Sequence, residues 1–267
     1  LAMMLIEAGI KRNIEFFVQT ESKEDPAINL TTNYVLDKTD SLEGTKELIT
    51  KCNCITFENE WLDIHQLLKI KKQDVRFIPS LESLAPLINK ISQRQLINRL
   101  GIPGPNWIEL SSVVKNHRIL PKEWNYPVMA KTSKGGYDGK GTKVINDSKE
   151  LNDLISNNNK DNWFLESWVN YERELALVAS RDSKGRIRTF PLTETFQVNQ
   201  ICDWVFAPAD VVRDVQLMAY NVASSILVEL NYVGVIAIEF FYGSSGLIVN
   251  EIAPRTHNSA HYSIEAC

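Results

Sequence analysis

The sequence predicts a mixed fold in which an α/β part is followed by an α+β part. In residues 1–77, short apolar runs alternate with helical stretches, an order that is typical of a parallel sheet. In residues 126–252, β-rich runs are joined by turns that contain glycine, which is typical of antiparallel hairpins. The chain has 267 residues, of which 44% are hydrophobic, so it is long enough for two or three domains with a sizeable core.

The composition argues against two classes of partner. The net charge of −4 gives no basic surface for nucleic acid, and no apolar run is long enough to span a membrane. The four cysteines have no zinc-like spacing, which favours reduced thiols in a cytoplasmic protein. Because Leu1 opens inside an apparent helix without a cap, we expect the sequence to be an internal part of a longer chain.

The α/β part is predicted from its caps and apolar runs. A helix over residues 1–8 should end at Gly9, and a second helix is expected over residues 41–52. Four buried strands are expected at residues 14–20, 33–37, 54–58 and 75–80. The run Glu58-Asn59-Glu60 follows a strand end, where open sheets bind ligands, but we expect it to cap the next helix. A further helix should begin at Ser92 and end before Gly101.

A glycine-rich hairpin follows at residues 126–147. Strands at 126–132 and 142–147 flank the sequence SKGGYDGKG, which matches neither a P-loop nor a dinucleotide fingerprint. Its bare backbone N–H groups suit a lid over phosphate oxygens, and a merely flexible turn is the alternative. Lys131 favours the lid, because a lysine in an apolar strand is costly unless it meets an anion.

The next strands carry two acidic residues. Glu166 lies in the strand over residues 163–169. Glu174 begins a strand that forms a hairpin across residues 182–185, and it either binds a ligand or simply faces solvent. A helix is expected over residues 209–230, with a core stripe formed by Val211, Val215, Met218, Val222, Ile226 and Leu230.

The last hairpin carries two more acids. The turn at residues 243–246 joins two β-rich runs, so Glu239 and Glu251 lie nearly opposite each other. A four-residue loop would place them on opposite faces, whereas a five-residue loop or a one-residue bulge would place them on one face. We predict the second arrangement. Two carboxylates on one buried face repel each other unless a cation lies between them, and such hard oxygen ligands suit Mg²⁺; two solvated acids are the alternative.

Polar side chains crowd the end of this hairpin, namely Asn250, Glu251, Arg255, His257, Asn258 and His261. This set suits chemistry on an anion beside a metal better than it suits a core strand. If the segment is helical, His257 and His261 could share a face and bind zinc, but no third ligand is evident.

These motifs, in this order, resemble the ATP-grasp superfamily. GGYDGKG and NEIAPRTHNSAHY together are similar to the N5-carboxyaminoimidazole ribonucleotide synthetases, and the resemblance covers essentially the whole chain. It implies an ATP-grasp fold with an N-terminal Rossmann-like (preATP-grasp) domain, truncated at both ends. The implied divisions are an N-terminal domain at residues 1–98, a central subdomain with the glycine-rich lid at 99–165 and a C-terminal subdomain at 166–267.

The resemblance also implies roles for individual residues. The ATP-binding set comprises Lys90, Lys131, Gly136, Tyr137, Asp138, Gly139, Lys140, Gly141, Thr142, Glu166, Ser167, Trp168, Val169, Glu174, Gln197, Asn250 and Glu251. The implied Mg²⁺ ligands are Glu239 and Glu251, and the implied catalytic residues are Arg255, His257 and Asn258. Four positions depart from the family pattern: Thr142 stands where Gln is expected, Gln197 where His is common, Lys90 where Arg is frequent and Ala260 where Gly is frequent.

The implied activity is the ATP-dependent carboxylation of aminoimidazole ribotide with bicarbonate, through carboxyphosphate, in purine biosynthesis. The resemblance also implies a cytoplasmic homodimer. Two alternatives stay open at this point. One is another ATP-grasp ligase, such as a formate-dependent purine transformylase or a biotin carboxylase; the other is a non-catalytic nucleotide-binding module.

Overall fold

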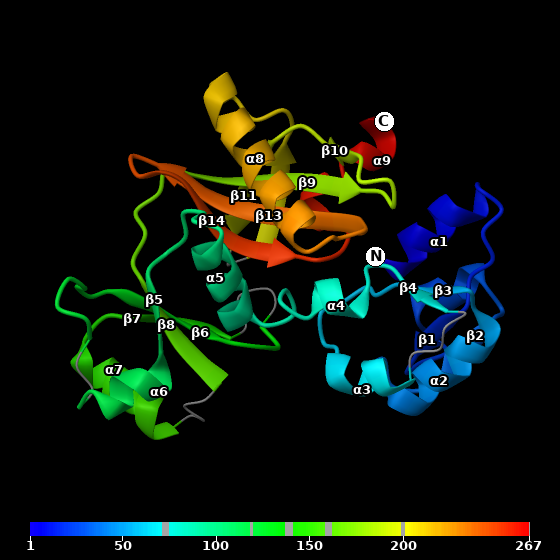
Figure 1. Ribbon diagram of the computed structural model, residues 1–267, viewed down its shortest axis with the longest axis horizontal. Coiled ribbons are helices and arrows are strands. Elements are labelled where there is room, and N and C mark those ends of the chain that lie inside the picture. Colours follow the sequence, from blue (N-terminus) through cyan, green and yellow to red (C-terminus); the bar gives the residue numbers. More distant parts are fainter. Residues whose placement is uncertain (71–74, 118–119, 137–140, 158–161, 199–200, 267) are drawn as a thin grey trace. The chain divides into compact units, whose positions relative to one another are not determined.

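The computed structural model describes residues 1–70, 75–117, 120–136, 141–157, 162–198 and 201–266. These residues divide into two compact units, Leu1–Ala85 and Pro86–Cys267 (Figure 1). The predicted division into three parts, at residues 98 and 165, stays a prediction. Among the described residues, no helix is both long enough and apolar enough to cross a membrane.

The first unit is an α/β unit, as predicted. Its elements are α1 (Ala2–Ile10), β1 (Val18–Thr20), η1 (Pro26–Leu30), β2 (Tyr34–Leu36), α2 (Leu42–Lys51), β3 (Cys54–Ile55), α3 (Ile64–Ile70), β4 (Arg76–Phe77) and α4 (Leu81–Leu84). Strand β1 pairs with β2 and strand β3 pairs with β4, and both pairs are parallel. The strand–helix alternation in the sequence therefore did indicate parallel pairing.

One predicted helix end in this unit is wrong. Helix α1 continues through Gly9 to Ile10 and is capped by Lys11, while Asn13 adopts the left-handed conformation. Gly9 serves packing instead, because a Cβ atom at this position would collide with the ring of Phe16. A glycine near the end of a helix can therefore permit a close contact without ending the helix.

The second unit begins with a helix and a four-stranded sheet. These elements are α5 (Lys90–Arg99), β5 (Trp107–Glu109), α6 (Leu110–Lys115), β6 (Val128–Thr132), β7 (Thr142–Ile145), α7 (Ser148–Asn157) and β8 (Trp163–Ser167). The strand order is β5-β8-β6-β7, and each pairing is antiparallel. Leu110, Val128, Ile145, Leu151 and Leu165 form part of the core beneath this sheet.

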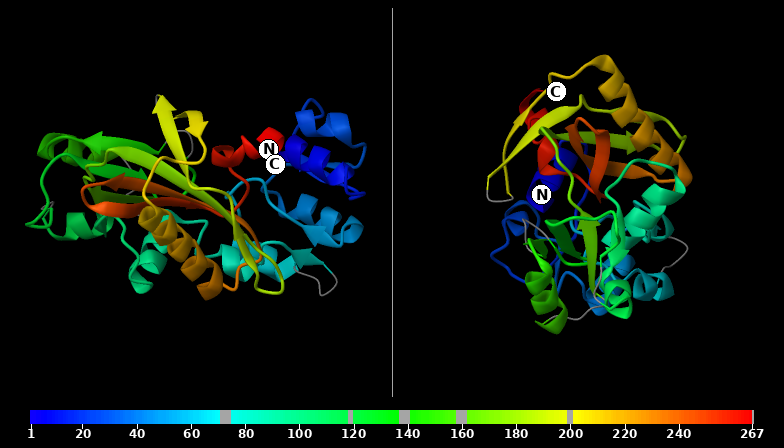
Figure 2. Two further views of the ribbon diagram at one scale, coloured as in Figure 1. Left: turned by 90° about the horizontal axis from the view of Figure 1, so that it is seen from above. Right: turned by 90° about the vertical axis from the view of Figure 1, so that its left-hand side faces the viewer.

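A six-stranded sheet completes the described part of this unit. Its elements are β9 (Arg173–Arg181), β10 (Ile187–Thr189), β11 (Thr193–Val198), β12 (Ile201–Phe206), α8 (Arg213–Glu229), β13 (Gly234–Gly243), β14 (Gly246–Ala253), η3 (Asn258–Ala260) and α9 (Ser263–Ala266). The main strand order is β12-β11-β9-β13-β14, and β10 pairs with β9. Helix α8 packs against β9 and β14, as Figure 2 also shows, and η3 packs against β9 and β12.

Two helix predictions in the second unit need correction. Helix α5 begins at Lys90 and is capped by Asn89 instead of Ser92, because the Asn89 side chain accepts hydrogen bonds from the N–H groups of Ile91 and Ser92. The predicted end is correct, since Gly101 has a φ of +64°. In α8, Met218 is exposed, and the buried stripe runs through Val215, Ala219, Ala223, Ile226 and Leu227.

Candidate functional site

The hairpin of β13 and β14 places Glu239 directly opposite Glu251, as predicted. Near the turn, Gly243 pairs with Gly246 and Phe240 pairs with Val249. The register then shifts by one residue, so that Asn250 is extra in β14. In such a bulge, two residues of one strand oppose a single residue of the other. Asn250 and Glu251 therefore both face Glu239, and the Asn250 amide lies 3.4 Å from the Glu239 carboxylate.

The strand register gathers further polar residues on the same face of the sheet. Glu239 pairs with Ala176 of β9, two residues from Glu174. Glu174 in turn pairs with Thr195 of β11, two residues from Gln197. Because side chains alternate along a strand, Glu174, Gln197, Glu239 and Glu251 share one face. Element η3 lies on this face too, because its Ala260 packs against the cluster of Val178, Ala237 and Ala253.

The paired carboxylates differ in their electrostatic surroundings. The Lys90 Nζ atom lies 2.5 Å from Oε2 of Glu251. Burial alone would raise the pKa of Glu251, but the charge and hydrogen bond of Lys90 hold it below its ordinary value. Burial, together with the charge of Glu251, raises the pKa of Glu239 to about 7, and Glu174 contributes to this shift. A cation between the carboxylates would relieve this repulsion.

Lys131 projects from β6 into a buried cluster of charges. Its Nζ atom lies 2.9 Å from Oε2 of Glu166 and donates a hydrogen bond of 3.1 Å to Oδ1 of Asn250. Burial lowers the pKa of Lys131, and the charge of Glu166 opposes this effect. Burial would raise the pKa of Glu166, but the charges of Lys131 and Arg94 hold it below its ordinary value. We take both groups as charged, because Glu166 contacts two cations and Lys131 contacts two oxygen acceptors.

Sequence reasoning missed two buried residues of α5. The Arg94 Nε atom donates a 2.5 Å hydrogen bond to Glu166, and its Nη2 atom donates to the Asn250 carbonyl at the same distance. Gln93 bonds both the N–H and the carbonyl of Ile252. A weak signal was present, because Gln93 and Arg94 lie three residues before the apolar pair Leu96 and Ile97 and so share their face of the predicted helix.

The glycine-rich hairpin is present as predicted, with Lys131 of β6 paired with Thr142 of β7. Gly141 has a φ of +83°, and its carbonyl accepts a hydrogen bond from the N–H of Thr132. A Cβ atom on Gly141 would collide with Oγ1 of Thr132 and lie 3.2 Å from Cα of Gly136. The predicted lid residues Tyr137, Asp138, Gly139 and Lys140 lie outside the described residues.

The candidate adenine and ribose contacts lie at the ends of two strands. Ser167 ends β8, and its N–H donates to the carbonyl of Asn106. Trp168 is exposed and Val169 is half-buried beyond that strand. Glu174 accepts a 2.8 Å hydrogen bond from the Tyr171 hydroxyl. The structure shows no direct contact between Ser167, Trp168 or Val169 and the carboxylate pair among the described residues.

The segment after β14 brings one of the three proposed catalytic residues to the carboxylates. His257 Nε2 lies 3.4 Å from Oε1 of Glu239, and its Nδ1 atom is 3.0 Å from the Ser259 hydroxyl. Burial, followed by the charge of Arg255, lowers the pKa of His257 to about 4. Asn258 begins η3, and its buried Oδ1 atom has no hydrogen-bond partner among the described residues. Arg255 donates to the carbonyl of Thr256.

The donor set fits Mg²⁺ better than zinc. The described residues contain no cluster of three or more His, Cys, Asp and Glu side chains that could hold a metal alone. Mg²⁺ is commonly held by one or two carboxylates together with substrate phosphates and water. Glu239 and Glu251 on one face supply those carboxylates, with the cations of Lys90 and Lys131 beside them for an anionic substrate.

Comparisons with known proteins match both units. Residues 95–267 match the ATP-grasp domain, and residues 1–87 match the ribonucleotide synthetase preATP-grasp domain. The whole chain is 40% identical to an N5-carboxyaminoimidazole ribonucleotide synthase of Synechocystis, of which it covers 69%.

Solved structures agree with this match. A carboxyaminoimidazole ribonucleotide synthase of Aspergillus clavatus complexed with ATP has a TM-score of 0.90 at 26% identity, over 99% of this chain and 70% of that one. A structure of the synthase from the same organism, in complex with ADP and 5-aminoimidazole ribonucleotide, has a TM-score of 0.87 at 26% identity, with the same coverage.

Proposed function

The chain belongs to the N5-carboxyaminoimidazole ribonucleotide synthases of the ATP-grasp family, and we propose that the residues around Glu239 and Glu251 carry their reaction in this protein. The enzyme is an ATP-dependent ligase that carboxylates 5-aminoimidazole ribonucleotide in purine biosynthesis. The family match favours this acceptor over formate or biotin. The observation that carries the residue assignment is the bulge that turns Asn250 and Glu251 together toward Glu239.

Nucleotide binding is assigned to the charges between the two sheets of the second unit. Lys131 is buried and contacts oxygen acceptors, so its ammonium is placed to hold a phosphate oxygen of ATP. Lys90 is the second phosphate contact, and it would exchange its present partner Glu251 for the nucleotide. We assign residues 136–142 to the lid, residues 166–169 to the adenine-binding edge, and Glu174 and Gln197 to further nucleotide contacts.

The two carboxylates Glu239 and Glu251 would hold Mg²⁺, with Asn250 beside them. When bound, Mg²⁺ neutralises charge on the terminal phosphates of ATP during transfer. With a cation bound at Glu251, Lys90 would be available to contact a phosphate oxygen instead of its present partner. The raised pKa of Glu239 supports this assignment, since burial and a neighbouring carboxylate disfavour its charge when no cation is present.

Bicarbonate is the proposed source of the carboxyl group. Arg255 and Asn258 lie on the segment that follows Glu251, where a guanidinium and an amide suit a planar anion. Bicarbonate would attack the γ-phosphate of ATP, which displaces ADP and forms carboxyphosphate. The amine of the ribonucleotide would then take up the carboxyl group as inorganic phosphate and a proton leave. His257 is held by Ser259 and Glu239, so we assign it to the orientation of a reactant. The lowered pKa of His257 favours the neutral imidazole for this role. Closure of the lid would exclude water from the labile intermediate.

The predicted homodimer stays a prediction.

Phosphate release by the full-length enzyme tests the proposed reaction. The assay contains Mg²⁺, ATP and bicarbonate, with and without 5-aminoimidazole ribonucleotide. We expect strong stimulation by the ribonucleotide and dependence on bicarbonate. Stimulation that persists after bicarbonate is removed would overturn the proposed carboxyl source.

Glu251→Gln tests the metal assignment within the same assay. Loss of the carboxylate should abolish ATP turnover, because the amide cannot neutralise the metal. Glu229→Gln is the matched control, because Glu229 is an exposed glutamate that pairs with Arg99 on the surface. Turnover by Glu251→Gln at the rate of the control would show that Glu251 is not a metal ligand.

A further inference from the structure

Strand β14 is an edge strand of the six-stranded sheet, and the segment around α5 covers its open backbone groups. The N–H of Val249 donates a 2.9 Å hydrogen bond to the carbonyl of Pro103. Arg94 donates to the carbonyls of Val249 and Asn250, at 3.4 Å and 2.5 Å. Gln93 accepts from the N–H of Ile252 at 3.1 Å and donates to its carbonyl at 2.8 Å.

These contacts bracket Glu251 on both sides. Arg94 holds the two residues before it, and Gln93 holds the residue after it. Both side chains are almost wholly buried, with 4% of Gln93 and 3% of Arg94 exposed. A bulge interrupts the regular hydrogen-bond ladder and leaves one residue unpaired. The unpaired residue here is Asn250, whose carbonyl is the one that Arg94 takes up.

We propose that Gln93 and Arg94 are positioning residues, which fix the bulge in β14 and thereby orient Glu251 toward the metal. The inference rests on the proposed role of Glu251 as a metal ligand. Neither side chain touches the carboxylate of Glu251. They bind the backbone of the neighbouring residues Asn250 and Ile252. Arg94 also fixes Glu166, which holds Lys131 beside Asn250. Helix α5 thus carries one direct partner of Glu251, Lys90, and two residues that hold its strand.

A purely structural role for the two residues predicts a different outcome. If Gln93 and Arg94 only stabilise the fold, their loss lowers thermal stability and weakens every ligand to a similar extent. If they position Glu251, their loss selectively weakens the coupling between Mg²⁺ and the nucleotide. Residues that orient a metal ligand typically change metal affinity by about 10- to 100-fold.

The test measures binding of AMP-PNP, a non-hydrolysable ATP analogue, by isothermal titration calorimetry. Each full-length protein is titrated in Mg²⁺ and again in EDTA, and the ratio of the two affinities gives the metal coupling. The variants are Gln93→Met, which keeps the side-chain length without polar atoms, and Arg94→Lys, which keeps the charge without the planar fork. Glu251→Gln gives the ratio of affinities that is expected when the proposed metal ligand is lost.

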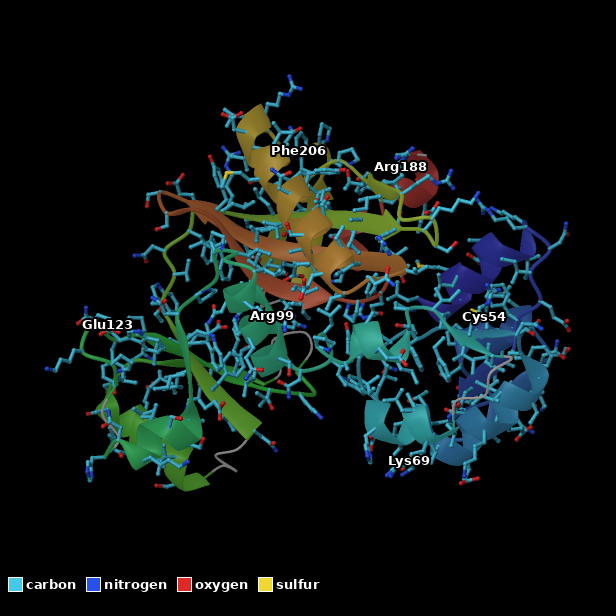
Figure 3. All side chains as sticks on the ribbon, viewed as in Figure 1. Cys54, Lys69, Arg99, Glu123, Arg188 and Phe206 are labelled. Atoms are coloured by element: carbon cyan, nitrogen blue, oxygen red, sulfur yellow. The ribbon has the colours of Figure 1, made fainter. Side chains whose placement is uncertain are left out.

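Helix α5 provides matched controls on its exposed side. Gln95→Met and Arg99→Lys make the same chemical changes at exposed positions; Arg99 is labelled in Figure 3. We expect both controls to keep the wild-type ratio. The ratio should fall by roughly tenfold or more in Gln93→Met and in Arg94→Lys, while affinity in EDTA changes much less.

The outcomes separate the two proposals. Equal losses of affinity in Mg²⁺ and in EDTA, or a wild-type ratio in Arg94→Lys, would overturn the positioning role. If the wild-type enzyme and Glu251→Gln give the same ratio, the metal assignment itself has failed. Should Gln93→Met not fold, Arg94→Lys decides the question alone, because it retains a cation against Glu166.

Discussion

Lys131 and Glu166 form an ion pair of 2.9 Å in the interior of the second unit, with 7% and 2% of the two residues exposed. They come from neighbouring strands β6 and β8, and Arg94 of α5 contacts the second oxygen of the same carboxylate. A single carboxylate is thus the counter-charge that two buried cations share. Lys131 keeps a hydrogen bond to Asn250 at the edge of the carboxylate site.

Glu166→Gln should destabilise the protein at neutral pH. The amide leaves two buried cations without a counter-charge, and breaking a buried pair typically costs about 3–5 kcal/mol. The pKa of Glu166 is held below 4.5, so its stabilising charge is fully present above that pH and is lost as the pH falls through the folded-state pKa. The gap in unfolding temperature between wild type and variant should therefore narrow below about pH 4.5. A gap that is constant from pH 7 to pH 3.5 would contradict the depressed pKa.

Lys131→Met should weaken ATP binding. A hydrogen bond to a charged group contributes about 1.5–3 kcal/mol, so the KM for ATP should rise by roughly 10- to 100-fold. Lys143→Met is the control, because Lys143 lies on the paired strand β7 but is exposed. Steady-state kinetics with full-length enzyme give both values. An unchanged KM in the folded Lys131→Met protein would limit Lys131 to a structural role.

Glu174→Gln should weaken ATP through the loss of ribose contacts. A carboxylate accepts hydrogen bonds from sugar hydroxyls more strongly than an amide, so we expect roughly a tenfold loss of affinity. The sharp comparison uses 2′,3′-dideoxy-ATP, which has no such hydroxyls. Its affinity should be equal in wild type and variant. If both nucleotides lose affinity to the same extent, Glu174 acts elsewhere, for example through its contact with Tyr171.

Gly141→Ala should impair catalysis more than a matched change in another hairpin. Gly141 and Gly185 have φ values of +83° and +81°, so alanine costs each about 1–2 kcal/mol of backbone strain. Only Gly141 belongs to the proposed lid, and a Cβ atom at this position would also collide with Thr132. Both variants should lower the unfolding temperature, and only Gly141→Ala should lower kcat. Equal kcat values in the two variants would favour the flexible-turn interpretation of the loop.

The pairing of Glu239 and Glu251 could be predicted, because the alternation of side chains along a strand decides which face each carboxylate occupies. Glu239 and Glu251 can share a face only through a longer loop or a bulge, and the bulge is what the structure has. The glycine-rich hairpin could be predicted for the same local reasons. Short-range patterns of this kind constrain residues that lie within one hairpin.

Arg94 and Gln93 could not be predicted in this way. Their partners in β14 lie more than 150 residues further along the chain, and no local pattern specifies which strand is left at the edge of a sheet.

Met218 illustrates another limit of prediction from the sequence. Positions three and four residues apart both satisfy a helical period, so the pattern did not decide which stripe of α8 faces the sheet.

The cover that α5 provides over β14 has a consequence for association between copies of this chain. An open edge strand offers unpaired N–H and carbonyl groups to any other strand and is a starting point for aggregation. Here the N–H groups of Val249 and Ile252 donate to Pro103 and Gln93. The carbonyls of Val249, Asn250 and Ile252 accept from Arg94 and Gln93. The same contacts that hold Glu251 in place therefore close this edge to intermolecular β-sheet growth.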